Sequence, residues 1–431
     1  MKIQRREFLK TAAALAAFPT IIPASAVGAE GRPAPSNRLT AAIIGLGDRG
    51  TQHASTLFGM PQAQIIAVCD PYRKKSDQWK ARVEDHYART SSGGNYKGCA
   101  AYQDFREILA RPDVDVVFIT APENWHALIS IAAMGAGKDV YCEKALSLTV
   151  AEGRAMCEAV RRFGRVFQTG TQQRSERGFR LACELARNGY LGDVHTVRVS
   201  VPGGRALPLA APKPPPPDLN YEVWLGPAPW TPYNDVKCTY NWYFMSDYCA
   251  GWIQSWGVHH IDIALWGAPE LAASTLDVEG TATFPTEGLA NTSVSWEVAC
   301  TPPKGPRLLF TDDSKGQHGV RFIGDKGWVH VVRGGIRAEP ESLLSVKLKP
   351  GDQHLPVSDH HLLDFFEAVN TRRDPVAPVE GGHAATTLTL ISDIATRLQR
   401  KLTWNWNSEK FTNDSAANAL LGRSMRSPWT L

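Results

Sequence analysis

The chain has 431 residues, more than a single hydrophobic core ordinarily supports, so we expect two domains. Its composition, 43% hydrophobic and 21% charged residues, is that of a globular protein and excludes disorder over most of the length. The formal net charge is only +4 and no basic patch stands out, so we expect no nucleic-acid partner.

The N-terminus resembles an export signal. Residues Gln4–Lys10 carry the arginine pair of a twin-arginine motif, and an apolar run over Thr11–Ile22 follows it. The small residues Ala24–Ala26 then resemble a cleavage site. We predict that residues 1–29 are a twin-arginine signal peptide and that the protein is periplasmic or otherwise exported. We expect no membrane anchor, because the apolar run is short for a bilayer and is broken by Pro19.

The eight cysteines form no Cys-x-x-Cys pair, so the sequence does not support a zinc site, and we expect no metal. Export permits disulfides, and Cys238 and Cys249 are the nearest pair in sequence. Most of the others, such as Cys69 and Cys142, lie in apolar runs. Because twin-arginine cargo folds in the reducing cytoplasm, buried free thiols are the favoured interpretation.

The first half of the chain alternates strands with helical patterns. Its strands are continuous apolar runs rather than alternating ones, which is typical of a parallel sheet covered on both faces. We predict a doubly wound α/β domain of the Rossmann type over residues 38–168. The predicted strands are Leu39–Ile44, Ala63–Cys69, Val114–Thr120, Asp139–Cys142 and Arg165–Thr169.

The second half has a different pattern, with short strands separated by Gly, Pro and Asp turns. Helical periodicity interrupts them over Gly251–Trp266 and again at about Ser358–Asn370. We predict an α+β domain over residues 169–431 with a large, mostly antiparallel open sheet. The predicted strands are Val194–Val201, Asn291–Cys300, Arg307–Phe310, Val320–Ile323, Trp328–Val332 and Leu343–Leu348.

A glycine-rich turn, Gly45-Leu46-Gly47-Asp48-Arg49-Gly50, follows the first strand and opens a helix. Its first glycine permits the tight turn, its second lets the backbone approach a pyrophosphate, and its third permits close helix–strand packing. Asp70 ends the second strand at the spacing of the acid that accepts the ribose hydroxyls of adenosine. These features predict a nicotinamide dinucleotide site. Asp70 would repel a 2′-phosphate, which favours NAD, whereas Arg73 and the lysines after it leave NADP possible.

Two further segments follow buried strands of the first domain. Thr120-Ala121-Pro122-Glu123-Asn124-Trp125-His126 lies at the switch point where ligands bind, although His126 could equally cap or pack a helix. Glu143 and Lys144 place opposite charges directly after a buried strand, which indicates a cleft. Lys144 there could stabilise the alkoxide of a substrate as hydride leaves; the alternative is a surface ion pair.

In the second domain Ser255, His259 and Asp262 are spaced to share one helix face. Histidine is suited to take a hydroxyl proton near neutral pH. Considered alone, His259 also fits an interior packing role.

Together these residues resemble the glucose-fructose oxidoreductase/inositol dehydrogenase (Gfo/Idh/MocA) family over essentially the whole mature chain. The order and spacing of the motifs carry the resemblance more than any single one. Besides those above, the matching segments are Gly170–Ser175, Trp224–Pro227, Trp256–Asp262 and His360–Pro378.

The resemblance implies that Lys144, from the family's Glu-Lys-Pro motif, and His259, its proton-transferring histidine, are catalytic. The implied cofactor contacts are Gly45, Leu46, Gly47, Asp48, Arg49, Gly50, Asp70, Arg73, Thr120, Ala121, Pro122, Trp125, His126, Glu143, Lys144, Gln172 and Arg174. The implied substrate contacts are Lys144, Arg174, Ser255, His259, His260 and Asp262.

Two residues depart from the family pattern. Ala145 replaces the proline after the lysine, which removes a rigid φ. Ser255 stands where the family has an aspartate four residues before the histidine, and serine cannot supply that charge. Asp262 or Asp247 could substitute for it; otherwise the reaction is modified or lost.

The expected activity is NAD(P)-dependent oxidation or reduction of a secondary alcohol of a sugar, glycoside or cyclitol, with a tightly held cofactor. One alternative is a redox-neutral glycosidase, lyase or epimerase that oxidises a ring carbon transiently. Another is a non-catalytic relative that binds cofactor and sugar. By resemblance we expect a small-molecule sugar or polyol as the substrate and a homo-oligomer, dimer or tetramer.

Overall fold

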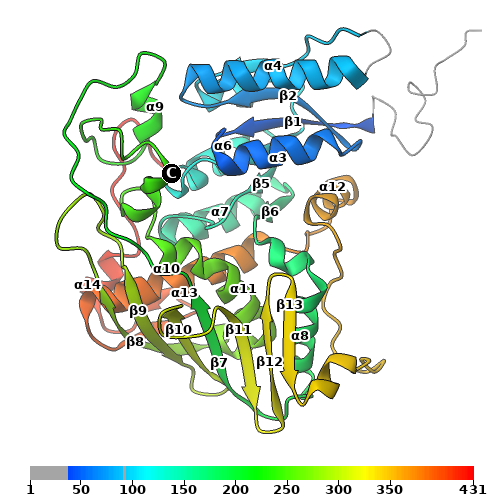
Figure 1. Ribbon diagram of the computed structural model, residues 1–431, viewed down its shortest axis with the longest axis vertical. Helices are drawn as coiled ribbons and strands as arrows, with labels where there is room; N and C mark the ends of the chain where they lie inside the picture. The colour runs from blue at the N-terminus through cyan, green and yellow to red at the C-terminus, as the bar shows by residue number, and fades with distance from the viewer. Residues whose placement is uncertain (1–36, 91–93) are drawn as a thin grey trace, which may run out of the picture.

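The computed structural model describes residues 37–90 and 94–431, so the predicted signal peptide lies outside the described residues. The N-terminal domain is built on a parallel sheet of six strands in the order β3-β2-β1-β4-β5-β6 (Figure 1). This is the strand order of a doubly wound dinucleotide-binding fold, and it confirms the predicted fold class. The strands are β1 (Leu39–Ile44), β2 (Ala63–Cys69), β3 (Ala100–Tyr102), β4 (Val116–Ile119), β5 (Asp139–Cys142) and β6 (Phe167–Thr169).

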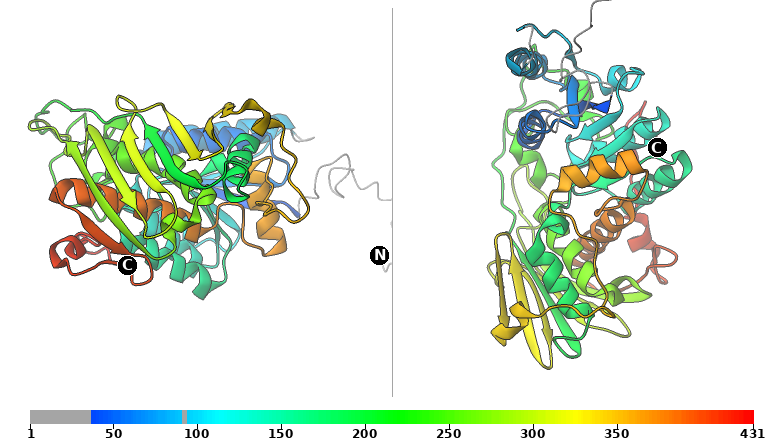
Figure 2. Two further views of the ribbon diagram at one scale, coloured as in Figure 1. Left: turned by 90° about the horizontal axis from the view of Figure 1, so that it is seen from below. Right: turned by 90° about the vertical axis from the view of Figure 1, so that its right-hand side faces the viewer.

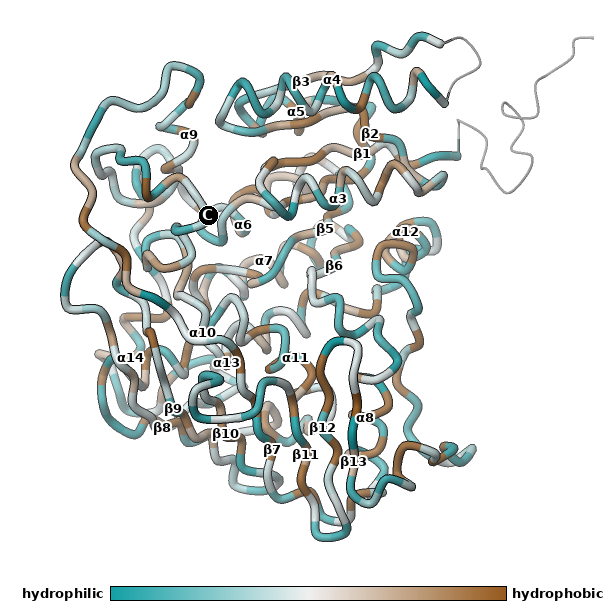
Figure 3. The backbone as a smooth tube through the Cα atoms, in the orientation of Figure 1, coloured by the Kyte–Doolittle hydropathy of each residue, from teal (hydrophilic) through white to brown (hydrophobic). Residues whose placement is uncertain are grey.

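Helices cover both faces of this sheet because its strands are buried on both sides. One face packs against α3 (Asp48–Phe58), α4 (Arg73–Thr90) and α12 (His361–Thr371). The other packs against α5 (Phe105–Leu109), α6 (Glu123–Gly135) and α7 (Val150–Phe163). Helix α12 therefore returns from the second half of the chain, so the two domains are not two contiguous segments. In Figure 3 the outer helix α4 is largely hydrophilic, as its exposed position requires.

The C-terminal domain is built on a nine-stranded sheet in the order β13-β12-β11-β7-β10-β9-β8-β14-β15. Only the pair β7–β10 is parallel, so the prediction of a mostly antiparallel sheet is confirmed. The strands are β7 (Val194–Val201), β8 (Thr275–Thr283), β9 (Ser295–Thr301), β10 (Arg307–Asp312), β11 (Gly319–Gly324), β12 (Gly327–Val332), β13 (Gly335–Glu339), β14 (Leu402–Asn405) and β15 (Lys410–Phe411).

The helices of this domain lie on one face of the sheet, as the right-hand view of Figure 2 shows. They are α8 (Arg177–Arg187), α11 (Gly257–Gly267) and α13 (Val379–Leu398). The predicted helix over residues 251–266 is two helices, because α10 (Trp252–Ser255) ends before α11 begins. The strand predicted over Leu343–Leu348 is wrong: Glu341–Ser345 form a 3-10 turn whose buried anchor is Leu343.

After β7 the chain returns to the first domain in a long segment, residues 202–250, which we call the crossover segment. It contains α9 (Tyr221–Leu225) and a 3-10 helix η3 (Tyr240–Phe244). Its backbone pairs with the loop after β2: Arg73 N donates to Asp218 O at 2.8 Å and Asn220 N donates to Pro71 O at 2.9 Å. The crossover segment therefore lies against the carboxyl-terminal edge of the parallel sheet (Figure 1).

All eight cysteines are free thiols, and seven of them are buried. Across residues 37–90 and 94–431, no helix combines the length and the apolar character that crossing a membrane requires.

Candidate active site

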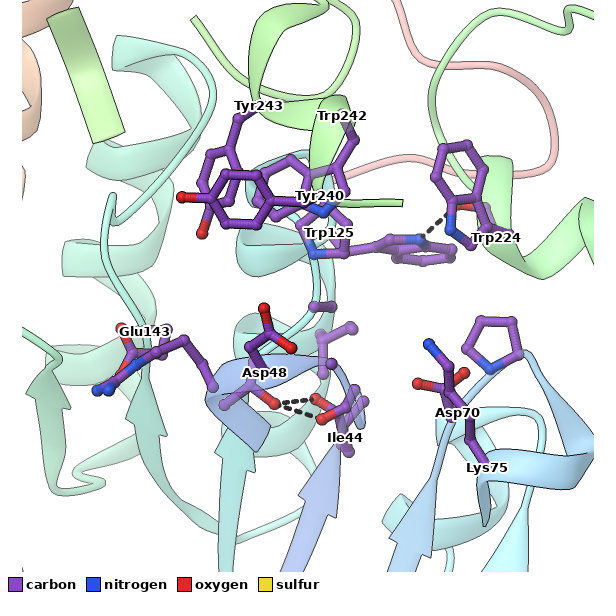
Figure 4. Close-up of a pocket in the computed structure, with 18 of the residues that line it drawn as sticks. Ile44, Asp48, Asp70, Lys75, Trp125, Glu143, Trp224, Tyr240, Trp242 and Tyr243 are labelled. Atoms are coloured by element: carbon purple, nitrogen blue, oxygen red, sulfur yellow. Dashed lines mark hydrogen bonds and ion pairs between the residues drawn. The ribbon is translucent and has the colours of Figure 1, made fainter. Parts of the chain in front are cut away.

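A cavity of about 460 Å³ lies where the loops after β1, β2, β4 and β5 meet the crossover segment and α11. The carboxyl ends of parallel strands converge here, which is the usual ligand position in such a sheet. Figure 4 shows Asp48, Asp70 and Glu143 on the Rossmann side, with Tyr240, Trp242 and Tyr243 facing them from η3. Both domains therefore contribute to one cavity.

The glycine-rich turn is shaped for a close-lying ligand. Gly45 has φ +97°, and a Cβ there would meet Ala121 N at 2.7 Å. A Cβ at Gly50 would lie 1.9 Å from Gly45 O, so the helix packs directly on the turn. Gly47 lines the cavity, and a Cβ there would meet no atom of the described chain within 4 Å. The backbone is thus open at the start of α3, where free N–H groups attract a pyrophosphate. These residues fit a dinucleotide.

Asp70 lies at the end of β2 and lines the cavity. Its Oδ2 accepts a hydrogen bond from Leu46 N at 2.8 Å, and its Oδ1 accepts one from Tyr72 N at 2.9 Å. Burial raises the pKa of this carboxyl, against the opposing charge of Lys75 and the two backbone donors. Lys75 also lines the cavity, whereas Arg73 does not, so Lys75 replaces Arg73 as the cation near the adenosine position.

Glu143 belongs to a buried polar cluster rather than to a surface ion pair. Its Oε1 accepts hydrogen bonds from Arg49 Nη2 at 2.7 Å and Gln172 Nε2 at 3.1 Å, and lies 2.7 Å from His53 Nε2. Burial alone would raise the pKa of Glu143, but Arg49 and His53 hold it well below its usual value. The carboxylate thereby fixes Arg49 and Gln172 at the cavity wall.

Lys144 lines the cavity and is anchored from the second domain. Its Nζ donates to Ser255 Oγ at 2.8 Å and to Ser255 O at 3.0 Å. Two of its three N–H groups are thus used, which leaves one for a ligand. Burial lowers the pKa of Lys144, and the carboxylates of Glu123 and Glu143 oppose that effect.

His259 lies in the first turn of α11 and also lines the cavity. Burial lowers the pKa of the imidazole well below its usual value, and the positive charges of Lys144 and Arg333 lower it further. His259 is therefore neutral at neutral pH, the form that can accept a proton. Within the described residues its Nδ1 has no hydrogen-bond partner.

Besides Leu46, Gly50 and Arg73, four predicted contacts whose side chains have other partners do not line the cavity: Arg174, Asp262, His260 and His126. Arg174 donates from Nε and Nη2 to the two carboxylate oxygens of Asp262, both at 2.7 Å, so neither side chain is available for a substrate. Asp262 therefore does not replace the missing aspartate. His260 Nε2 lies 3.4 Å from His318 Nε2. His126 bridges two backbone carbonyls through Nδ1 and Nε2, at 2.7 and 2.8 Å, which is a packing role.

Ser255 and Asp247 do not line the cavity either, although the Ser255 hydroxyl accepts a hydrogen bond from Lys144, which does.

The sequence analysis did not predict the aromatic wall of the cavity, which Tyr240, Trp242 and Tyr243 of the crossover segment form. Trp242 stacks on Tyr243 with ring centroids 3.7 Å apart, and Tyr240 lies 4.9 Å from Tyr243 (Figure 4). The aromatic run Tyr240–Phe244 was the available signal, but only the fold places it opposite the glycine-rich turn.

The fold and the cavity define a two-domain protein with a dinucleotide-binding site. Residues 39–171 match the model for the NAD-binding Rossmann fold of an oxidoreductase family, and residues 204–431 match the model for its C-terminal alpha/beta domain. The chain therefore belongs to the Gfo/Idh/MocA oxidoreductase family, and its N-terminal domain is NAD-binding.

Curated relatives match over part of their length. Myo-inositol 2-dehydrogenase of Thermotoga maritima is 32% identical over 158 residues, 37% of this chain and 43% of that protein. Glycosyl hydrolase family 109 protein 1 of Shewanella sp. (strain ANA-3) is 30% identical over 165 residues, 35% of each chain. The solved structure of an aldose-aldose oxidoreductase from Caulobacter crescentus shares the fold, with a TM-score of 0.61 and 21% identity, covering 84% of this chain and 99% of the other.

Proposed function

We propose that the protein transfers hydride between bound NAD and a secondary alcohol of a sugar, glycoside or cyclitol. The observation that carries this proposal is the meeting of Lys144 and His259, from different domains, in the cavity that also contains the glycine-rich turn. The names of the inositol dehydrogenase and aldose-aldose oxidoreductase relatives support a polyhydroxylated substrate.

Each group has a role that its geometry supports. The open start of α3 would hold the pyrophosphate and Asp70 the adenosine ribose. When bound, NAD would accept or return hydride at its nicotinamide. Neutral His259 would take the hydroxyl proton, and the free N–H of Lys144 would stabilise the charge that develops on the same oxygen. Arg174, Asp262 and His260 would maintain the fold around these groups.

The aromatic wall supports a sugar-type ligand. Tyr240, Trp242 and Tyr243 line the cavity, and the centroid of the Tyr243 ring lies 5.5 Å from Lys144 Nζ. Aromatic faces pack against the apolar C–H faces of a sugar ring, while convergent polar groups orient its hydroxyls.

The crossover segment supports slow release of the dinucleotide. Trp224, Cys238 and Thr239 line the cavity together with Asp70 and Lys75. The segment is tied to the first domain through Asp218 and Asn220 and through the Trp125 Nε1 bond to Trp224 O at 3.4 Å. A ligand beneath it leaves only when these contacts open.

A tightly held cofactor favours reactions that regenerate it in place. Reactions that regenerate the cofactor in place are also favoured outside the cytoplasm. We propose from residues 4–26 that the protein is exported by the twin-arginine route. A redox-neutral cycle is therefore the second candidate, and the family 109 glycosyl hydrolase relative supports it. We further propose a homo-oligomer, by family resemblance.

Single-turnover spectroscopy separates these functions. The protein would be purified without added nucleotide and mixed with a panel of sugars, glycosides and polyols while the NADH absorbance band is followed. Stable NADH formation identifies a dehydrogenase, and a transient identifies the redox-neutral cycle. No change with any member of the panel, in protein shown to contain NAD, refutes both and indicates the non-catalytic relative. The Lys144→Met variant is the control.

A further inference from the structure

Glu123 is a carboxyl group buried directly behind the cavity. It is the first residue of α6, and only 1% of its surface is exposed. Its Oε1 lies 3.7 Å from Cys249 Sγ, and its Oε2 has no hydrogen-bond partner among the described residues. An under-bonded carboxyl at this depth is costly unless a positive charge lies nearby.

The positive charge beside Glu123 is Lys144. Each attracts the other, and both contact the segment that precedes α11: Lys144 Nζ donates to Ser255 Oγ at 2.8 Å, and Glu123 Oε1 lies 3.7 Å from Cys249 Sγ. The other nearby carboxylate, Glu143, already pairs with Arg49 and His53, so these two groups balance most of its negative charge.

We propose that Glu123 is a positioning residue that supplies the counter-charge of Lys144, in place of the aspartate that Ser255 replaces. In the family pattern that charge stands four residues before the histidine, in the second domain. Here it comes from Glu123 at the start of α6, in the first domain. This inference rests on the proposed function only in giving Lys144 a role in the reaction.

The charge of Glu123 changes the protonation of Lys144. Burial lowers the pKa of Lys144, and Glu123 is the strongest opposing influence, so removing its charge lowers that pKa further. Burial raises the pKa of Glu123 itself to about 7, against the attraction of Lys144. Above that pH the carboxylate supports the ammonium charge, and below it the support declines. The other titratable groups that face Lys144 are Glu143, Arg49, Cys249, Tyr243, His259 and His126.

Competitive acetylation of the purified protein measures this effect without any substrate. Acetic anhydride reacts with neutral lysine, so the labelling rate of Lys144, read by mass spectrometry, reports its neutral fraction. We expect Glu123→Gln to label Lys144 about tenfold faster above pH 7, where Glu123 is ionised, because one opposite charge nearby shifts a pKa by about a unit or more. Glu123→Asp keeps the charge and should label slowly. Glu184→Gln is the matched control: it alters a buried carboxyl that accepts from Leu355 N at 3.0 Å, in the second domain.

A second test asks whether a carboxylate at position 255 restores the protonation of Lys144. The double variant Glu123→Gln/Ser255→Asp returns a carboxylate to the family position and should restore slow labelling. With a substrate in hand, Glu123→Gln should lower kcat at least tenfold with little change in KM, move the basic limb of the pH profile to lower pH, and recover in the double variant.

Unchanged Lys144 labelling in folded Glu123→Gln, or no rescue in the double variant, overturns the proposal. A labelling change without turnover of any sugar instead leaves the charge pairing intact and refutes the proposed function, so the two failures are distinguishable.

Discussion

Replacing Asp70 with alanine removes the carboxylate that lies between the glycine-rich turn and the adenosine end of the cavity. Hydrogen bonds to a charged group contribute about 1.5–3 kcal/mol each, and each 1.4 kcal/mol is about tenfold in affinity. Loss of one such bond to the ribose should therefore weaken NAD by about ten- to a hundredfold. NADP should weaken less, because the variant also loses the repulsion of the 2′-phosphate, so the preference for NAD should narrow by about tenfold.

The assay is the Kd of each dinucleotide, measured on protein stripped of its cofactor. Asp70 also accepts from Leu46 N and Tyr72 N, so the melting temperature must be followed to separate binding from stability. Asp115→Ala is the matched control, since Asp115 Oδ2 accepts from Thr40 N at 2.8 Å but does not line the cavity. An unchanged ratio of the two Kd values in a folded Asp70 variant refutes the reasoning, as does tighter NADP binding by the unaltered protein.

Three other variants and one pH dependence test the remaining assignments. Lys144→Met and His259→Ala should each abolish turnover while NAD still binds, and unchanged turnover in either removes the assignment of that residue. The acidic limb of the rate should lie well below pH 6.5, because burial lowers the pKa of His259 and only its neutral form accepts the proton; a limb at or above 6.5 contradicts this. Asp262→Ala should lower the free energy of unfolding by about 3–5 kcal/mol, because it leaves buried Arg174 unpaired. The Kd of the Asp262→Ala variant for NAD should stay the same. A large change in that Kd would show that Asp262 is part of the binding site.

The Rossmann domain could be predicted because its central strands are buried on both faces and appear as continuous apolar runs. Strand β5, Asp139–Cys142, has the predicted bounds. Strand β3, Ala100–Tyr102, was missed because it is a short, half-buried edge strand without such a run. Helix α13, Val379–Leu398, was missed because it is buried almost all round, with buried threonines among its apolar residues, so no separate apolar face reveals its period.

Local geometry explains why some of the predicted residues line the cavity. The glycine-rich turn, Asp70 and Lys144 follow strands whose ends converge, so their place in the cavity follows from the topology. Pairings between distant segments could not be predicted, because Arg174 and Asp262 are far apart in sequence and either alone resembles a ligand contact. The position of Glu123 behind Lys144 likewise depends on how the first turn of α6 meets the second domain.

Isotope transfer tests the central claim most directly. The protein, purified without added nucleotide, would be incubated with uniformly deuterated glucose and, separately, with deuterated myo-inositol, and then quenched during turnover with cold methanol at neutral pH, because acid destroys NADH. Mass spectrometry of the released dinucleotide should find deuterium on the nicotinamide, and none with the Lys144→Met variant. In a redox-neutral cycle the deuteride returns to the sugar, so there the label is present only in samples quenched during turnover. Dinucleotide without deuterium after a full panel of deuterated sugars and polyols, or protein that releases no dinucleotide, would contradict a bound-NAD oxidoreductase.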